Sequence, residues 1–146
     1  MLVQHILKGK PEPYRQIVTV TPDSTVADAA KLMSEARIGA VVVSADGHRL
    51  DGILSERDIV RELGRHGAGC MQDRVSLLMT SAIVTCTPMD TADQVLERMT
   101  TGRFRHLPVM DGDEMLGLIS IGDVVKARID ELAMEKEALT GMIMGY

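Results

Sequence analysis

Aromatic residues are scarce in this 146-residue chain, which has one Phe, two Tyr and no Trp. Proteins that bind single-stranded nucleic acid stack the bases on aromatic side chains along a basic groove. This chain instead has a formal net charge of −5, so its field repels both nucleic acid and anionic lipid. We therefore expect neither a nucleic-acid nor a membrane partner, and any anionic ligand must be bound by local geometry.

Long apolar runs and paired cysteines are also missing. No stretch approaches the roughly 18 uninterrupted apolar residues that a membrane span needs. Lys8 and Lys10 follow too short an apolar stretch for a secretory signal. Cys70 and Cys86 are too far apart for a C-x-x-C pair, so reduced, structural thiols are expected. These absences predict a cytoplasmic protein.

Patterns typical of catalytic and metal sites are absent as well. The four histidines show no spacing typical of metal ligands, so no metal site is predicted. There is no G-x-S-x-G element, and no nucleophile stands in a known motif with its base. We predict that the chain is not an enzyme.

The chain does contain an internal repeat. Thr-Pro pairs end at Pro22 and at Pro88, 66 residues later, and past a one-residue deletion the offset of 65 aligns Gly52 with Gly117. Such a repeat predicts a duplicated fold. Because one unit of about 60 residues buries only about 60% of its extended-chain surface, we expect the two copies to share a core.

Each copy reads as β-α-β-β-α, which places the fold in the α/β (α+β) class. Thr25 and Thr91 are N-cap candidates that precede amphipathic helices. Asp46-Gly47 and Asp111-Gly112 predict tight hairpin turns. β-branched runs between turn residues predict the strands, which in the first copy are 17–21, 40–43 and 50–55.

The repeat divides the chain into four segments: repeat 1 (1–66), a glycine-rich linker (67–74), repeat 2 (75–128) and a C-terminal helical extension (129–146). Lys8–Pro13 includes about six residues without a counterpart in repeat 2, and its prolines and glycine predict a loop. Gly64–Gly69 lacks the phosphate-binding P-loop pattern and reads as a flexible connector.

A Ser-x-x-Asp pair begins the second helix of each copy, at Ser55 and Asp58 and again at Ser120 and Asp123. A helix N-terminus binds phosphate oxygens through its free N–H groups. A carboxylate one turn further on can accept hydrogen bonds from ribose hydroxyls. The same pair is also an ordinary capping arrangement, and duplication copies caps as readily as binding sites. The sequence leaves both interpretations open.

The order of these motifs resembles a tandem pair of cystathionine β-synthase (CBS) domains, the Bateman module, over about residues 1–130. Each copy has a Thr-Pro pair, a helix, an Arg-led apolar strand, an Asp-Gly turn and a Gly-x-x-Ser-x-x-Asp run. The resemblance implies two repeats related by a pseudo-twofold axis, with two clefts between them. It also implies an adenosine-containing ligand: AMP, ADP, ATP, NAD(H) or S-adenosylmethionine.

The resemblance also implies roles for individual residues. Threonines at the end of the first strand would contact base or sugar, and residues at the start of the second strand would line the adenine. The serines of the Ser-x-x-Asp pairs would contact phosphate and the aspartates ribose. The nucleotide-binding candidates are Thr21, Ile38, Gly39, Ala40, Ser55, Asp58, Thr87, Arg103, Phe104, Arg105, His106, Ser120 and Asp123.

The two copies differ in charge at these positions. The first offers uncharged residues at 38–40, whereas the second offers Arg105 and His106 beside Arg103. A cationic cluster can neutralise phosphate, so we expect the more highly charged end of the ligand near Arg105 and His106. The alternative is that the arginines are solvated residues at a strand edge.

The last helix is expected to run from Gly122 to about Met144. Its apolar positions recur three and four residues apart, which is the spacing of a helix-pairing seam. We favour a homodimer contact over a tail packed on its own domain. The leading hypothesis is a regulatory module for energy or redox sensing that binds the nucleotide without catalysis and signals to an unknown downstream protein. The alternative is a dimeric scaffold with vestigial clefts and a partner-recruiting helix.

Overall fold

The computed structural model describes residues 1–12 and 16–144. It divides into two compact units. The repeat-1 unit comprises Gln16–Ile83 and Gly112–Met115. The repeat-2 unit comprises Met1–Arg15, Val84–Asp111 and Leu116–Tyr146.

The repeat-1 unit is built on a three-stranded sheet in the order β1-β2-β3. β1 runs parallel to β2, with Val20 beside Val43, and β2 runs antiparallel to β3, with Ala40 beside Ser55. The strands are β1 (Thr19–Val20), β2 (Ala40–Val43) and β3 (Gly52–Ser55). The helices are α2 (Val26–Ala36), α3 (Glu56–His66), the 3₁₀ helix η2 (Ala68–Gln72) and α4 (Val75–Leu78).

The repeat-2 unit has a two-stranded sheet, β4-β5. Cys86 adds a single parallel bridge to Val109 at the place that β1 occupies in the other unit. The strands are β4 (His106–Asp111) and β5 (Glu114–Ser120), and the helices are α1 (Val3–Gly9), α5 (Ala92–Gly102) and α6 (Ile121–Met144). The expected β-α-β-β-α order is present in repeat 1, where the first strand has two residues, whereas in repeat 2 the single bridge at Cys86 stands in place of the expected first strand.

Hydroxyl caps start the helices that follow the Thr-Pro pairs, as the sequence predicts. The Thr25 hydroxyl accepts the Asp28 backbone N–H at 3.1 Å. The Thr91 hydroxyl accepts that of Gln94 at 3.2 Å, and the Gln94 side chain accepts the Thr91 N–H in return. These bonds satisfy N–H groups that have no partner inside the helix.

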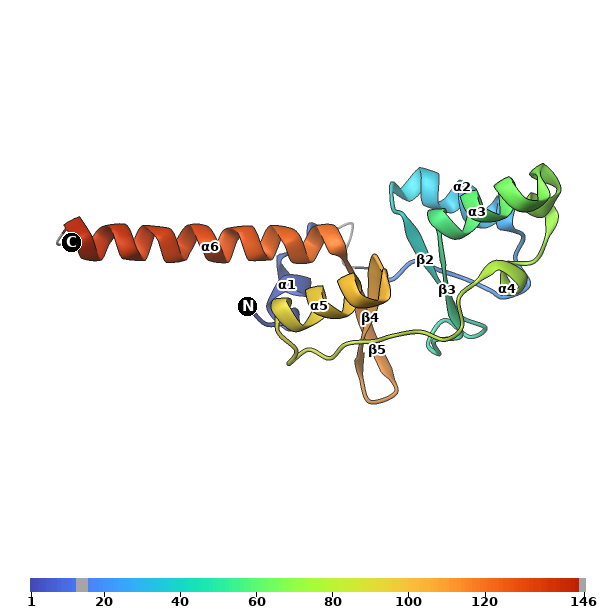
Figure 1. Cartoon of the computed structure of the whole chain (residues 1–146). Helices are drawn as coiled ribbons and strands as arrows, with labels where there is room; N and C mark the ends of the chain where they lie inside the picture. The colour runs from blue at the N-terminus through green and yellow to red at the C-terminus, as the bar shows by residue number, and fades with distance from the viewer. Residues whose placement is uncertain (13–15, 145–146) are drawn as a thin grey trace. The chain divides into compact units, whose positions relative to one another are not determined.

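The first helix of each repeat packs in the unit of the other repeat. α4 docks in the repeat-1 unit, where the Val75 N–H donates to the Ser24 carbonyl at 2.8 Å. α1 docks in the repeat-2 unit through the equivalent bond, from the Val3 N–H to the Asp90 carbonyl at 2.8 Å. Each repeat thus lends one helix to the other (Figure 1).

Each unit has its own cluster of buried side chains. Nine buried positions of the repeat-1 cluster have buried counterparts in the repeat-2 cluster. The apolar face of a sheet must be buried against other elements, and in each unit the exchanged helix supplies part of that cover. The equivalent pairs are Val26/Ala92, Ala29/Val95, Met33/Met99, Val41/Leu107, Val43/Val109, Leu54/Ile119, Ile59/Val124, Val75/Val3 and Leu78/Ile6.

Two glycines that align in the repeat let the exchanged helices approach the sheet. A Cβ at Gly52 would lie 2.5 Å from the Met79 sulfur, just past α4. A Cβ at Gly117 would lie 2.9 Å from a methyl carbon of Leu7 on α1. The repeated glycines are therefore explained by close packing rather than by a turn.

The two hairpin connections differ, and only one matches the prediction. β4 and β5 are joined by a tight turn in which Gly112 has a φ of 59°. β2 and β3 are instead joined by the wider loop 44–51, so the predicted tight turn at Asp46-Gly47 is wrong. Within this loop the Asp46 carboxylate accepts the backbone N–H groups of Arg49 and His48, which lowers the pKa of Asp46 to about 2.

The glycine-rich connector is folded, contrary to expectation. α3 continues through Gly64 to His66, and Gly67, with a φ of 75°, ends it. η2 then buries Cys70 against α2 and α3. The segment that composition alone assigns to a linker is thus packed on its own unit, with Cys70 as its buried side chain.

Candidate nucleotide site

The Ser55–Asp58 pair forms a complete capping box at the start of α3. The Ser55 N–H donates to Asp58 Oδ2 at 2.9 Å, and the Asp58 N–H donates to Ser55 Oγ at 3.3 Å. Arg61 on the next turn binds the other oxygen, Oδ1, at 2.9 Å. Asp58 is only 6% exposed. Both of its oxygens are therefore engaged within its own helix.

The Ser120–Asp123 pair has the same capping geometry at the start of α6 but a different cation. The Ser120 N–H donates to Asp123 Oδ2 at 2.9 Å, and the Asp123 N–H donates to Ser120 Oγ at 3.1 Å. Lys10, from the predicted loop, lies 3.0 Å from Asp123 Oδ2 and donates to the Leu118 carbonyl at 3.0 Å. A cation from a distant segment thus replaces the helical arginine.

The start of the second strand lies beside the helix start in both units. The Glu56 N–H donates to the Gly39 carbonyl at 2.9 Å, and the Ile121 N–H donates to the Arg105 carbonyl at 2.8 Å. These bonds bring the segment 38–40 next to Ser55 and Asp58. They bring Arg105 and His106 next to Ser120 and Asp123 in the same way.

Thr21 and Thr87 lie elsewhere within their units. Thr21 follows β1 beside the C-terminal end of β2, whereas Ser55 pairs at the N-terminal end of β2. At about 3.3 Å per residue this separates Thr21 from Ser55 by about 10 Å or more. The Thr21 hydroxyl bonds Ser24 at 2.9 Å, and the Thr87 N–H donates to Asp90 at 2.8 Å. Within a unit, the structure does not bring these threonines to the Ser-x-x-Asp pair.

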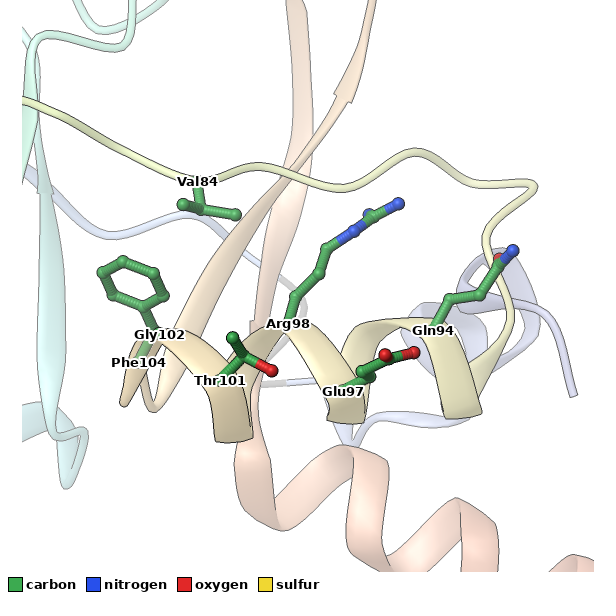
Figure 2. A pocket seen from close by; sticks show the side chains of 7 residues that line it. All are labelled: Val84, Gln94, Glu97, Arg98, Thr101, Gly102 and Phe104. Atoms are coloured by element: carbon green, nitrogen blue, oxygen red, sulfur yellow. The ribbon is translucent and has the colours of Figure 1, made fainter.

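A pocket of about 410 Å³ opens beside Phe104 in the repeat-2 unit. Figure 2 shows the Phe104 ring near Val84, with the polar side chains of α5 further along the helix. One end of the pocket is therefore apolar and the other is polar. The size lies within the range of small-molecule sites. Its lining residues are Val84, Gln94, Glu97, Arg98, Thr101, Gly102 and Phe104.

Arg98 in this pocket forms an ion pair with Asp90, and the two atoms Nη1 and Oδ2 are 2.7 Å apart. The hydrogen bond from Arg98, followed by the one from the Thr87 N–H, lowers the pKa of Asp90 despite its partial burial. Nearby, burial raises the pKa of the Cys86 thiol to about 12. Cys86 therefore stays protonated at neutral pH, as expected of a structural thiol.

The arginines of repeat 2 are placed at the end of α5. Arg103 caps the helix with a left-handed backbone, φ 58°, and Arg37 caps α2 in the same way, φ 56°. Non-glycine residues rarely adopt this conformation. Both Arg103 and Arg105 are exposed. Their exposure is compatible with ligand binding and with the alternative of solvated residues.

Sequence reasoning missed three kinds of residue near these sites. The sequence indicates Lys10 only as part of an insertion, because its partner Asp123 is more than a hundred residues away. Arg61 belongs to no motif, although its spacing of three from Asp58 permits an ion pair. The polar lining on α5 carries no motif at all.

Two negative findings concern the described part of the chain. Across residues 1–12 and 16–144, no group of three or more His, Cys, Asp or Glu side chains is arranged to hold a metal ion. None of the helices in those ranges is both long and apolar enough to cross a membrane.

Comparison with known proteins identifies the family of this chain. A model of the CBS domain matches residues 13–65 and 75–130. The chain is 37% identical over 129 residues to the mitochondrial CBS domain-containing protein CBSX3 of Arabidopsis thaliana, covering 86% of this chain and 63% of that protein. It spans 23% of the length of a second plant relative, CBSCBSPB2. The chain belongs to the CBS domain family, with two copies of the domain.

Solved structures agree with this assignment. The CBS-domain containing protein ATU1752 from Agrobacterium tumefaciens is 44% identical, with a TM-score of 0.82 over 88% of this chain and 99% of that one. The CBS domain pair of protein MJ0100, solved with 5′-methylthioadenosine and S-adenosylmethionine, is 21% identical. Its TM-score is 0.76 over 90% of this chain and 98% of that one, which shows a common fold. The predicted tandem CBS fold is confirmed.

Proposed function

We propose that this protein is a regulatory module that binds an adenine nucleotide without transforming it. The observation that carries the proposal is the geometry found twice, in which a Ser-x-x-Asp helix start lies one hydrogen bond from the start of a strand. Helix N–H groups and hydroxyls suit phosphate, and a carboxylate suits ribose. The ligands in the MJ0100 structure, both containing adenosine, support the ligand class.

The repeat-2 unit is the better candidate for a phosphorylated ligand. Asp123 keeps 24% of its side chain exposed, against 9% for Asp58. Phe104 offers a ring for the adenine at the apolar end of its pocket. Arg105 adds positive charge beside the α6 N-terminus, and His106 follows it in the chain. AMP, ADP, ATP and NAD(H) all carry the phosphate that this arrangement suits.

α6 is proposed to pass the signal on through a homodimer. One face of α6 carries a seam of four apolar residues and one lysine, with the alternating spacing of paired helices. We define this seam as Ile129, Leu132, Lys136, Leu139 and Ile143. Ile129, Leu132, Leu139 and Ile143 are between 51% and 83% exposed. A seam with this repeat is self-complementary, so a second copy of α6 is the partner that fits it. Lys136 within the seam would fix the register.

Titration calorimetry of the whole protein with AMP, ATP, NADH and S-adenosylmethionine tests the proposed function. Binding of at least one of them, weakened by Arg105→Ala and with no product formed, supports it. Glu35→Ala, an exposed change at the end of α2, is the matched control and should leave binding unaltered. Turnover of a ligand would make the protein an enzyme and contradict the proposal.

The alternative is a dimeric scaffold whose nucleotide sites are vestigial, and the long exposed α6 is the observation that favours it. The absence of binding by any nucleotide, together with a dimer that depends on the α6 seam, would select this alternative. The cytoplasmic location stays a prediction.

A further inference from the structure

Lys10 is the one described residue that brings a cation from the N-terminal insertion to an aspartate of a Ser-x-x-Asp pair. Its side chain is 13% exposed, and its ammonium lies 3.0 Å from both Asp123 Oδ2 and the Leu118 carbonyl. It therefore sits between the end of β5 and the start of α6. Taking a long, flexible lysine out of water costs both solvation and side-chain entropy, so a favourable interaction must hold it there.

Asp58, the equivalent aspartate of repeat 1, binds a cation from a different part of the chain. Arg61 belongs to the same helix as Asp58, is 47% exposed and occupies Oδ1, while the Ser55 N–H and hydroxyl occupy Oδ2. At Asp123, Lys10 and the Ser120 N–H share Oδ2. In the proposal below, ribose hydroxyls bind Oδ1 of Asp123 while Lys10 stays at Oδ2.

The consequence is electrostatic. The Lys10 ammonium offsets the Asp123 carboxylate at close range, so the positive end of α6 is no longer opposed by a net negative charge. An anionic group on a ligand then binds this helix end more tightly, and a cationic group binds it less tightly. With only 13% of Lys10 exposed, solvent screens this effect less than it screens a surface ion pair.

We propose that Lys10 is a specificity-determining residue that makes the repeat-2 site select phosphorylated adenosine ligands over uncharged or cationic ones. The proposal rests on the nucleotide-binding function proposed above. It predicts that AMP, with a 5′-phosphate, binds more tightly than 5′-methylthioadenosine, which is uncharged, and than S-adenosylmethionine, which carries a sulfonium. These three probes share the adenosine and differ in the charge at the 5′ position.

Calorimetry with these probes on the whole protein tests the proposal through Lys10→Met, which removes the charge and keeps much of the stem. We expect the AMP affinity to fall by about tenfold or more, as is typical for loss of a charged hydrogen-bonding partner, while the affinity for 5′-methylthioadenosine changes little. Lys10→Arg should keep the preference. Arg61→Met removes the cation from the equivalent aspartate in the other unit and should leave the preference intact.

The outcomes are distinct. A preference for AMP that is lost in Lys10→Met and kept in Lys10→Arg supports the proposal. An unchanged ratio of AMP to 5′-methylthioadenosine affinity in Lys10→Met overturns it, as does an equal gain for all probes, which would make Lys10 a mere competitor for Asp123. If Lys10→Met unfolds, Lys10→Gln replaces it: the amide removes the charge but can still donate to the Leu118 carbonyl, and the same loss of preference is expected. Wild-type protein that binds none of these probes and neither ATP nor NADH refutes the proposed function itself.

Discussion

The two units have the same interior and different surroundings. Nine buried positions of one have buried counterparts in the other, and each sheet is covered by a helix from the opposite repeat. The differences lie at the sites and at one terminus: Lys10 replaces Arg61, Phe104 replaces Ile38, and α6 is 24 residues long where α3 has 11. Packing constrains the interior of both copies equally, so divergence collects where side chains can meet a ligand or a partner.

The largest expected effect would break the equivalence of the two cores. Leu54→Ala and Ile119→Ala remove equivalent side chains, each fully buried. We expect each to lower the free energy of unfolding by about 2–5 kcal/mol, through lost burial and the cavity that remains. Urea denaturation measures this, with Leu116→Ala, 38% exposed, as the control. If one variant cost less than the control, the two cores would not be equivalent.

The second prediction concerns α6, the largest difference in length between the units. Leu132→Asp combined with Leu139→Asp places two charges in the exposed seam. We expect this variant to be monomeric in sedimentation equilibrium while the wild type is dimeric, because charges in a helix-pairing seam cannot be desolvated. Glu135→Ala and Glu137→Ala on the same helix should keep the dimer. A wild-type monomer would contradict the seam as a dimer contact.

The third prediction sharpens the comparison of Phe104 with Ile38, which occupy equivalent positions. Loss of a stacking ring costs about 1–3 kcal/mol per base, so Phe104→Ala should weaken AMP binding by about tenfold or more. Ile38→Ala should have a smaller effect, because an aliphatic side chain offers no ring. Calorimetry with AMP compares them. Equal losses in both variants would show that the units do not differ in adenine binding.

The smallest effect comes from Asp90, where repeat 1 has Ser24. The pKa of Asp90 is lowered in the folded protein, so its ion pair with Arg98 stabilises above the unfolded pKa of about 3.9. This contribution is lost as the pH falls through the folded pKa. Asp90→Asn should therefore cost on the order of 1 kcal/mol at pH 7 and progressively less below about pH 4. Unfolding of the wild type and of Asp90→Asn at pH 7 and pH 3 measures the difference in their stability. A difference as large at pH 3 as at pH 7 would show that it does not come from the ion pair with Arg98.

Sequence reasoning succeeds where the determinant is local. The caps at Thr25 and Thr91, the buried strand 40–43 and the repeated helix starts depend on neighbouring residues, and all were predicted. The resemblance also gave the correct family.

It fails where distant segments decide. The exchange of α1 and α4 depends on contacts between distant residues, such as Val75 with Ser24 and Val3 with Asp90, for which the repeat gives no sign. The wide loop after β2 depends on how the Asp46 carboxylate is satisfied. Lys10 reaches Asp123 across the whole chain. Such contacts follow from the fold and leave no motif.

The proposed function requires that the Ser-x-x-Asp pairs bind nucleotide in addition to capping helices. Calorimetric titration of AMP into Asp123→Asn, Asp58→Asn and the wild type tests it most directly. The capping geometry survives in part in asparagine, whose side-chain oxygen still accepts an N–H. We expect Asp123→Asn to keep its fold and to lose its AMP site. Folded Asp123→Asn that binds AMP with wild-type affinity and stoichiometry would contradict it.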